Sequence, residues 1–190
     1  GAADPSFTAR TITTSADGAI SVYAADVDND GDMDVVSASY SDDKIAWYES
    51  DGAADPSFTA RTITTSADGA RSVYAADIDN DGDIDVLSAS YFDNKIAWYE
   101  SDGAADPSFT ARTIATSANG AWSVYAADID NDGDTDVVSA SYSDDKIAWY
   151  ENDGASDPSF TANTITTSAD GAHSVYAADI DNDGDLDVLS

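Results

Sequence analysis

The sequence predicts an all-β protein made of β-propeller blades, each a four-stranded antiparallel sheet supplied by one tandem repeat of 51 residues. Three observations predict this fold class. The motif GAADPSF returns at a fixed spacing, the segments between turns are short and rich in Thr, Val, Ile, Tyr and Trp, and Gly, Asp, Asn and Pro separate them. Helical repeats of similar length would need amphipathic helices, and none is visible in the sequence.

The repeat divides the whole chain, residues 1–190, into four copies. GAADPSF begins three of them and the variant GASDPSF begins the last, at Gly1, Gly52, Gly103 and Gly154. The copies therefore cover residues 1–51, 52–102, 103–153 and, incompletely, 154–190. The chain begins with Gly and shows no signal peptide, so we expect it to be a processed or excised piece, a section of a larger propeller or blade array.

Each copy contains four predicted strands. In the first copy and its continuation they are SVYAAD at 21–26, DVVSASY at 34–40, KIAWYE at 44–49 and FTARTITT at 58–65. The third strand alternates two apolar sets, because Ile45 and Trp47 point to one face and Ala46 and Tyr48 to the other. A strand with two apolar faces belongs to a sheet packed between neighbouring sheets, as a blade is between blades.

The size of the side chains predicts the order of the strands in a blade. The first strand carries the small Ala24 and Ala25 and suits the crowded axis, whereas Trp47 and Tyr48 suit the outer part, where neighbouring blades diverge. The fourth strand is rich in Thr and suits a blunted outer edge.

The two ends of the chain leave the assembly open. The chain begins with the equivalent of a lone fourth strand at 7–14 and ends after the equivalent of a second strand at 185–190. Most propellers have four to eight blades. Three arrangements remain possible: a propeller completed by residues outside this sequence, one completed by another chain, or an open stack of blades. Self-association through unpaired edge strands fits the second and third arrangements.

The charge of the chain excludes some partners and favours others. With 7 Lys and Arg against 38 Asp and Glu, the formal net charge is −31. The phosphates of a nucleic acid would be repelled, and no run of apolar residues is long enough to span a membrane. Because 42% of the residues are hydrophobic, the chain can still build a core. Divalent cations are the natural partners of such a chain.

The acidic residues concentrate in one loop of each copy, which reads DVDNDGDMD at 26–34 in the first. Counting from Asp26, carboxylates stand at positions 1, 3, 5, 7 and 9, and Gly31 stands at position 6. Calcium takes six to eight hard oxygen ligands, which a tight loop supplies from alternate residues, while magnesium resists dehydration and fits less well. Strands flank this loop and position 12 is Ser37 rather than Glu, so it is not an EF-hand.

Calcium also explains why the chain tolerates so many like charges. The alternative is that these are ordinary solvated acidic turns, but surface acidity would not repeat one nine-residue pattern four times with the glycine fixed. Without metal the carboxylates of one loop repel each other, so we expect calcium binding and folding to be linked. Extracellular modules typically bind calcium at roughly 10⁻⁴–10⁻³ M, which favours an extracellular or cell-surface location.

The segment VYAADVDNDGDMDVVSASYSDDKIAWYESDG resembles the FG-GAP or VCBS repeats of integrin-α-like β-propellers, which carry such a loop between the first two strands of a blade. The resemblance covers essentially the whole chain, once per copy. It implies about one Ca²⁺ per repeat, with side-chain ligands at positions 1, 3, 5 and 9 and a backbone carbonyl ligand at position 7. These positions are Asp26, Asp28, Asp30, Asp32 and Asp34; Asp77, Asp79, Asp81, Asp83 and Asp85; Asp128, Asp130, Asp132, Asp134 and Asp136; and Asp179, Asp181, Asp183, Asp185 and Asp187. The chain lacks the literal FG and GAP strings, which places it nearer the VCBS branch, and integrin-like ligand specificity does not follow.

The sequence does not favour an enzyme. His173 is the only histidine and lies in the incomplete copy, and there is no cysteine. The loop aspartates are better explained as metal ligands than as catalytic carboxylates, and we interpret Glu49, Glu100 and Glu151 as solvated surface residues. We therefore predict no catalytic residue and no cofactor other than Ca²⁺.

Two of the positions that vary between the nearly identical copies are informative. The residue before SVYAAD is Ile20, Arg71, Trp122 or His173, and a residue in the turn after the second strand is Ser41, Phe92 or Ser143. If the strands alternate in direction, both positions lie on the rim opposite the calcium loops. Because aromatic side chains are favoured at recognition surfaces, our hypothesis is a partner-binding surface. It would consist of Ile20, Arg71, Phe92, Trp122 and His173. The alternative is drift at exposed positions.

Two classes of function stay open at this point. The first is a calcium-stabilised extracellular propeller module for adhesion, which binds a protein or a glycan. The second is a structural tandem repeat of a cell-surface adhesin or extracellular filament, in which calcium stiffens the array and is the only small ligand.

Overall fold

The computed structural model describes residue 4 and residues 6–190, and this part of the chain folds into strands and contains no helix. The first sheet consists of β1 (Ala19–Ala25), β2 (Asp34–Ser39), β3 (Lys44–Ser50) and β4 (Phe58–Thr64). The second consists of β5 (Ala70–Ala76), β6 (Asp85–Ser90), β7 (Lys95–Ser101) and β8 (Phe109–Ala115). The third consists of β9 (Ala121–Ala127), β10 (Asp136–Ser141), β11 (Lys146–Asn152) and β12 (Phe160–Thr166). The incomplete copy forms a two-stranded sheet of β13 (Tyr176–Ala178) and β14 (Asp187–Leu189).

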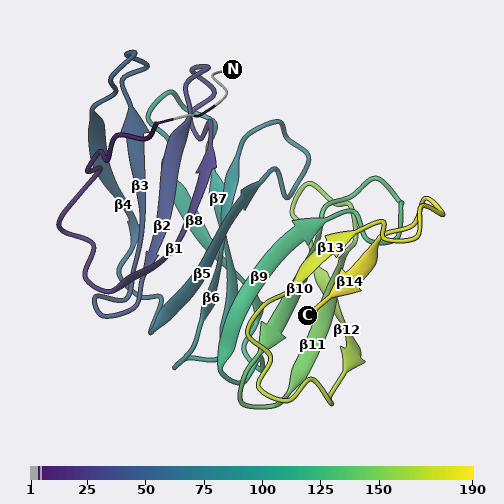
Figure 1. Cartoon of the computed structure of the whole chain (residues 1–190). Helices are drawn as coiled ribbons and strands as arrows, with labels where there is room; N and C mark the ends of the chain where they lie inside the picture. Colours follow the sequence, from purple (N-terminus) through teal and green to yellow (C-terminus); the bar gives the residue numbers. More distant parts are fainter. Residues whose placement is uncertain (1–3, 5) are drawn as a thin grey trace.

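Within each sheet the strands pair antiparallel in chain order, which confirms the predicted four-stranded blades. The sheets follow one another as an open arc, with the first and last copies at its two ends (Figure 1). Every second connection therefore lies on the same rim. The β1–β2 loop and its equivalents lie on one rim, and the β2–β3 turns lie on the other.

The first strand of each blade is the inner one, as the sequence predicts. One tyrosine from each inner strand stacks against the next, with ring centroids 4.4 Å apart for Tyr23 and Tyr74, 4.8 Å for Tyr74 and Tyr125, and 4.7 Å for Tyr125 and Tyr176. A serine hydroxyl of each inner strand also accepts a hydrogen bond from the backbone of the next copy. These bonds run from Val73 N to Ser21 Oγ (3.2 Å), from Val124 N to Ser72 Oγ (3.3 Å) and from Val175 N to Ser123 Oγ (3.3 Å).

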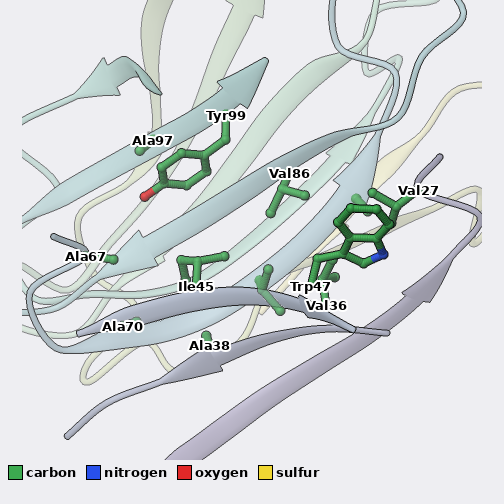
Figure 2. Close-up of a cluster of buried hydrophobic side chains, with 12 residues drawn as sticks. Val27, Val36, Ala38, Ile45, Trp47, Ala67, Ala70, Val86, Ala97 and Tyr99 are labelled. Carbon is green, nitrogen blue, oxygen red and sulfur yellow. The ribbon is translucent and has the colours of Figure 1, made fainter. Parts of the chain in front are cut away.

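The hydrophobic core lies between the blades, because both faces of each sheet are apolar. Ile45 and Trp47 of the first blade are fully buried against the second blade, where Val86 and Tyr99 belong to the same cluster (Figure 2). The same cluster recurs between the second and third blades around Trp98. Burying large side chains such as these contributes roughly 1.5–3 kcal/mol each, so the packing of blade on blade is a main source of stability.

The N-terminal segment differs from the prediction. The expectation of a fourth-type strand at 7–14 is wrong, since these residues form no strand. Instead Ile12 and Thr13 line a small apolar space over the first sheet together with Val22 and Tyr48. A strand here needs a preceding third strand as its hydrogen-bonding partner, and the described chain holds none before it. Nor does the described chain contain a helix that could cross a membrane.

Candidate metal centre

The acidic loop of each copy joins the two inner strands of its blade and is closed by its own aspartates. Ala25 at the end of β1 pairs with Asp34 at the start of β2, so both ends of the loop are fixed by the ladder. Asp26 then accepts hydrogen bonds from Asp30 N and Gly31 N, each at 3.0 Å. Gly31 has a φ of 96°, which favours glycine at this turn.

Three carboxylates converge inside each loop, those at positions 1, 3 and 9. In each group one oxygen per residue lies within 4.8 Å of the others. The groups are Asp26, Asp28 and Asp34; Asp77, Asp79 and Asp85; Asp128, Asp130 and Asp136; and Asp179, Asp181 and Asp187. The structure thus brings together three of the five aspartates that were predicted in each loop.

The position 9 aspartate forms the buried base of the site. Asp34 is 1% exposed, and its two oxygens accept hydrogen bonds from Ser50 N at 2.7 Å and Val27 N at 3.1 Å. Asp85 and Asp136 are held in the same way by backbone amides of their own blades. Each carboxylate is therefore oriented by one amide of its own loop and one amide at the end of the third strand of its blade.

Burial raises the pKa of several of these carboxyl groups. It raises the pKa of Asp85 to about 7, although the Ser101 and Ile78 amides act in the opposite direction. Burial is also the largest cause of the raised pKa of Asp79, and repulsion by Asp81 adds to it. A charged carboxylate is thus unfavourable in these loops unless a cation compensates it.

The aspartates at positions 5 and 7 lie outside the converging group. Asp30 accepts a hydrogen bond from Asp32 N at 2.9 Å. The side chain of Asp32 points away from the group and fills the space beside Gly52, where an added Cβ would lie 1.9 Å from its Oδ2. This direction fits the implied role of position 7, which needs only its backbone carbonyl. Sequence reasoning missed the role of Gly52, although its place in the repeated SDG turn was visible.

The donor set of the loop fits a hard divalent cation such as Ca²⁺. All the converging donors are carboxylate oxygens, which are the ligands that calcium prefers. Throughout the described residues, no Lys or Arg forms an ion pair with a loop aspartate; the cations pair with acids of other turns and strands. Three converging carboxylates without a basic partner leave the negative charge for a metal ion to neutralise.

The variable positions lie on the rim opposite these loops, as the strand directions predict. Ile20, Arg71 and Trp122 each stand at a β-bulge, where the pairing of the first strand with the second skips one residue. A bulge turns a side chain out of the regular alternation of the strand. Sequence reasoning missed the bulge. The residue type at this position differs from copy to copy while the strand sequence that follows stays the same, and this difference could have indicated it.

Most of the predicted rim residues meet around a row of tyrosines. The guanidinium of Arg71 lies over the ring of Tyr40 at 4.2 Å, and Trp122 contacts His173 with ring centroids 4.3 Å apart. The ring centroid of Phe92 lies 5.5 Å from that of Tyr40, and the Phe92 side chain is 55% exposed. Ile20, which holds the same position in the first blade, is 47% exposed. Sequence reasoning missed the constant Tyr40, Tyr91 and Tyr142, which carry the row.

Glu49 and Glu100, predicted as solvated, lie at the outer edge of the blades and are partly buried. Arg61 donates to Glu49 through Nε at 2.8 Å and Nη2 at 2.7 Å, and it pairs with Asp106 of the next copy. Arg112 pairs with Glu100 in the same way. These pairs hold the outer strands together.

Inner hairpins closed by an acidic loop, in four-stranded sheets stacked face to face, define a propeller-type repeat protein. A family model of the FG-GAP-like repeat matches residues 1–37, 26–88, 77–139 and 128–190. The chain belongs to the FG-GAP-like repeat family. No curated protein matches it.

Among solved structures, the chain is similar to an Agrocybe aegerita lectin. The TM-score is 0.59, the sequence identity is 18%, and the match covers 88% of this chain and 45% of the lectin chain. That structure is described as the basis of specific recognition of non-reducing terminal N-acetylglucosamine. At this identity the likeness shows the fold, and this chain spans less than half of the lectin.

Proposed function

We propose that this chain is a calcium-stabilised extracellular propeller module that presents its aromatic rim to a glycan. The observation that carries the calcium role is the convergence of three carboxylates in every loop without a basic partner. The buried position 9 aspartate holds the base of the site, and positions 1 and 3 close over it. When bound, the cation supplies the positive charge that lets all three carboxylates ionise together.

Glycan binding is supported by the opposite rim. Phe92 and Tyr142 expose aromatic rings on this rim, and Arg71 and His173 add hydrogen-bond donors beside them. The similarity to a lectin that recognises terminal N-acetylglucosamine favours a glycan over a protein as the ligand. A glycan array probed with and without calcium tests this role, and absence of binding in both conditions would contradict it.

The calcium role is tested by isothermal titration calorimetry with Asp79→Asn and a matched control. Asp79 accepts only one long hydrogen bond, of 3.3 Å from Asp81 N, so its replacement removes a ligand charge with little effect on the loop. We expect this variant to bind about one calcium ion fewer than the unaltered chain. The control is Asp68→Asn on the opposite rim, where the next copy already carries Asn119. Equal stoichiometry in both variants would contradict the site.

A structural array is the second candidate function. It is favoured by the bonds between copies, which recur at the inner strands and at the outer Arg61 and Arg112 pairs. In that case calcium would raise the stability of the folded array, and replacement of the rim residues would not change the affinity for any glycan or protein. Electron microscopy in calcium separates the two candidates, because an array forms continuous fibres and a binding module forms discrete particles.

A further inference from the structure

Neighbouring metal loops are joined by one hydrogen bond that recurs at every boundary between copies. The amide nitrogen Nδ2 of Asn29 donates to Oδ1 of Asp83 at 3.1 Å, and Asn80 and Asn131 donate to Asp134 and Asp185 at 3.0 Å. The donor is always position 4 of one loop, and the acceptor is always position 7 of the next. Through these three hydrogen bonds, each of the four loops is connected to the next along the rim.

The backbone of the donor loop fixes the direction of the amide. Asn29, Asn80 and Asn131 have φ values of 58°, 59° and 61°, in the left-handed region that Asn tolerates better than most residues. Each stands between positions 3 and 5, whose backbone and side chains wrap the converging carboxylates. In this conformation the amide reaches the carboxylate of the neighbouring loop.

The acceptor belongs to the part of the next loop that would supply a carbonyl ligand. The carboxylate of Asp83 receives the Asn29 amide on one side, and on another it lies against Gly103, where an added Cβ would be 2.0 Å from its Oδ2. Asp83 N also donates to Asp81 Oδ1 at 2.9 Å. The hydrogen bond from the preceding loop thus restrains the backbone of residue 83, whose carbonyl is the ligand expected at position 7.

We propose that Asn29, Asn80 and Asn131 are positioning residues that couple each metal loop to the next, so that calcium binds cooperatively along the rim. This inference rests on the proposed calcium function. A loop that is closed around its ion holds its asparagine in place, and that asparagine orders the next loop before the next ion arrives. Because coupling between binding sites is reciprocal, an ion in the later loop stabilises the earlier loop by the same factor.

The test replaces Asn80 in the 190-residue chain and observes the loop that follows. In Asn80→Gly the left-handed conformation is kept and the amide is lost. Calcium is titrated while the backbone amide NMR signal of Gly133 reports the third loop, whose sequence is unaltered. We expect the midpoint at Gly133 to rise about fivefold, the lower end of typical coupling between sites. We also expect the Hill coefficient of total binding to fall towards one.

Asn182→Gly is the matched control. Asn182 has the same conformation, with a φ of 62°, but within the described chain its amide has no acceptor. This variant should leave the Gly133 midpoint unchanged. A second variant, Asn80→Asp, places a carboxylate opposite Asp134 and should weaken the third loop further, because like charges repel.

The outcomes separate this inference from the function on which it rests. If Gly133 titrates with calcium at the same midpoint in the unaltered chain and in Asn80→Gly, the coupling is refuted and the calcium function stands. If no loop signal responds to calcium in the unaltered chain, both are refuted. Circular dichroism of each variant in calcium verifies that the blades are folded.

Discussion

The guanidinium carbon of Arg71 lies 4.0 Å from the centroid of the Trp122 ring, and both residues stand at β-bulges of neighbouring blades. Tyr40 lies against the guanidinium as well, at 4.2 Å. Among the described residues Arg71 forms no ion pair, although the chain carries 38 acidic residues. The aromatic rings therefore stabilise the guanidinium where a carboxylate would usually do so, and each cation–π contact contributes about 0.5–2 kcal/mol.

Replacement of the rim aromatics should weaken glycan binding and leave the fold intact. Phe92→Ser and Trp122→Ile each introduce a residue that another copy already holds at the same position, Ser41 and Ile20. We expect each to weaken binding about tenfold, as loss of an aromatic anchor does. Calorimetry with the best glycan from the array measures this. Arg10→Asn, which copies Asn163 and whose partner Asp55 lies in the β3–β4 connection away from this rim, is the control, and unchanged affinity in the first two variants would indicate drift.

Removal of calcium should lower the temperature of unfolding. A ligand present at 100 times its dissociation constant stabilises the folded state by about 2.7 kcal/mol per site, and the chain has four loops. Differential scanning calorimetry in excess EDTA, compared with millimolar calcium, measures the change. Magnesium should restore less than half of the loss, since it binds poorly to all-protein sites. An unfolding temperature that is the same in EDTA and in calcium would refute the metal role.

In EDTA the protein should become less stable as the pH rises. The pKa of Asp85 is raised to about 7 in the folded state from an ordinary value of 3.8, so the folded state holds its proton more tightly. The stabilisation is complete below pH 3.8 and is lost as the pH rises to about 7, with a slope of up to about 1.4 kcal/mol per pH unit.

Calcium should reverse this dependence, because the ion competes with the proton for the carboxylate. Urea unfolding at pH 5.5 and 8, with EDTA and with calcium, measures both effects. A metal-free protein that is more stable at pH 8 than at pH 5.5 would contradict the prediction.

The outer pair of Arg61 should contribute modestly to stability. Arg61→Asn copies Asn163 of the fourth copy, which donates a hydrogen bond to Glu151, and so removes the charged contacts with Glu49 and Asp106. Because the side chain is partly exposed, we expect a loss of about 1 kcal/mol in the free energy of unfolding. Arg10→Asn is the control, since both partners of the Arg10–Asp55 pair are 66% exposed and the pair should contribute almost nothing. Equal losses in the two variants would contradict this difference.

The features that depend on one copy could be predicted from the sequence. The strand predicted at 44–49 is β3, Lys44–Ser50, and the alternation of Ile45 and Trp47 with Ala46 and Tyr48 correctly indicated two buried faces. The repeat supplied four independent examples of each pattern, which made the acidic loop distinct from ordinary surface charge.

The individual contacts between neighbouring copies could not be predicted. A strand at 7–14 has the right composition, but a strand forms only where a partner offers its ladder. The Asn29–Asp83 bond joins residues 54 positions apart, and its existence depends on how one blade lies on the next. Within the loop, the sequence did not reveal that the Asp30 carboxylate accepts a hydrogen bond from Asp32 N at 2.9 Å. Spacing along the chain does not determine which backbone amide a loop carboxylate meets.

The serine bonds between inner strands have a consequence for how such a protein changes in evolution. Val73 meets Ser21 as Val124 meets Ser72 and as Val175 meets Ser123, so the inner strands meet in the same way at every boundary. A recombination event that deletes or duplicates one 51-residue unit joins two surfaces that already match. The number of blades can thus grow or shrink in a single genetic step, because the inner strands at the new boundary between blades fit each other at once.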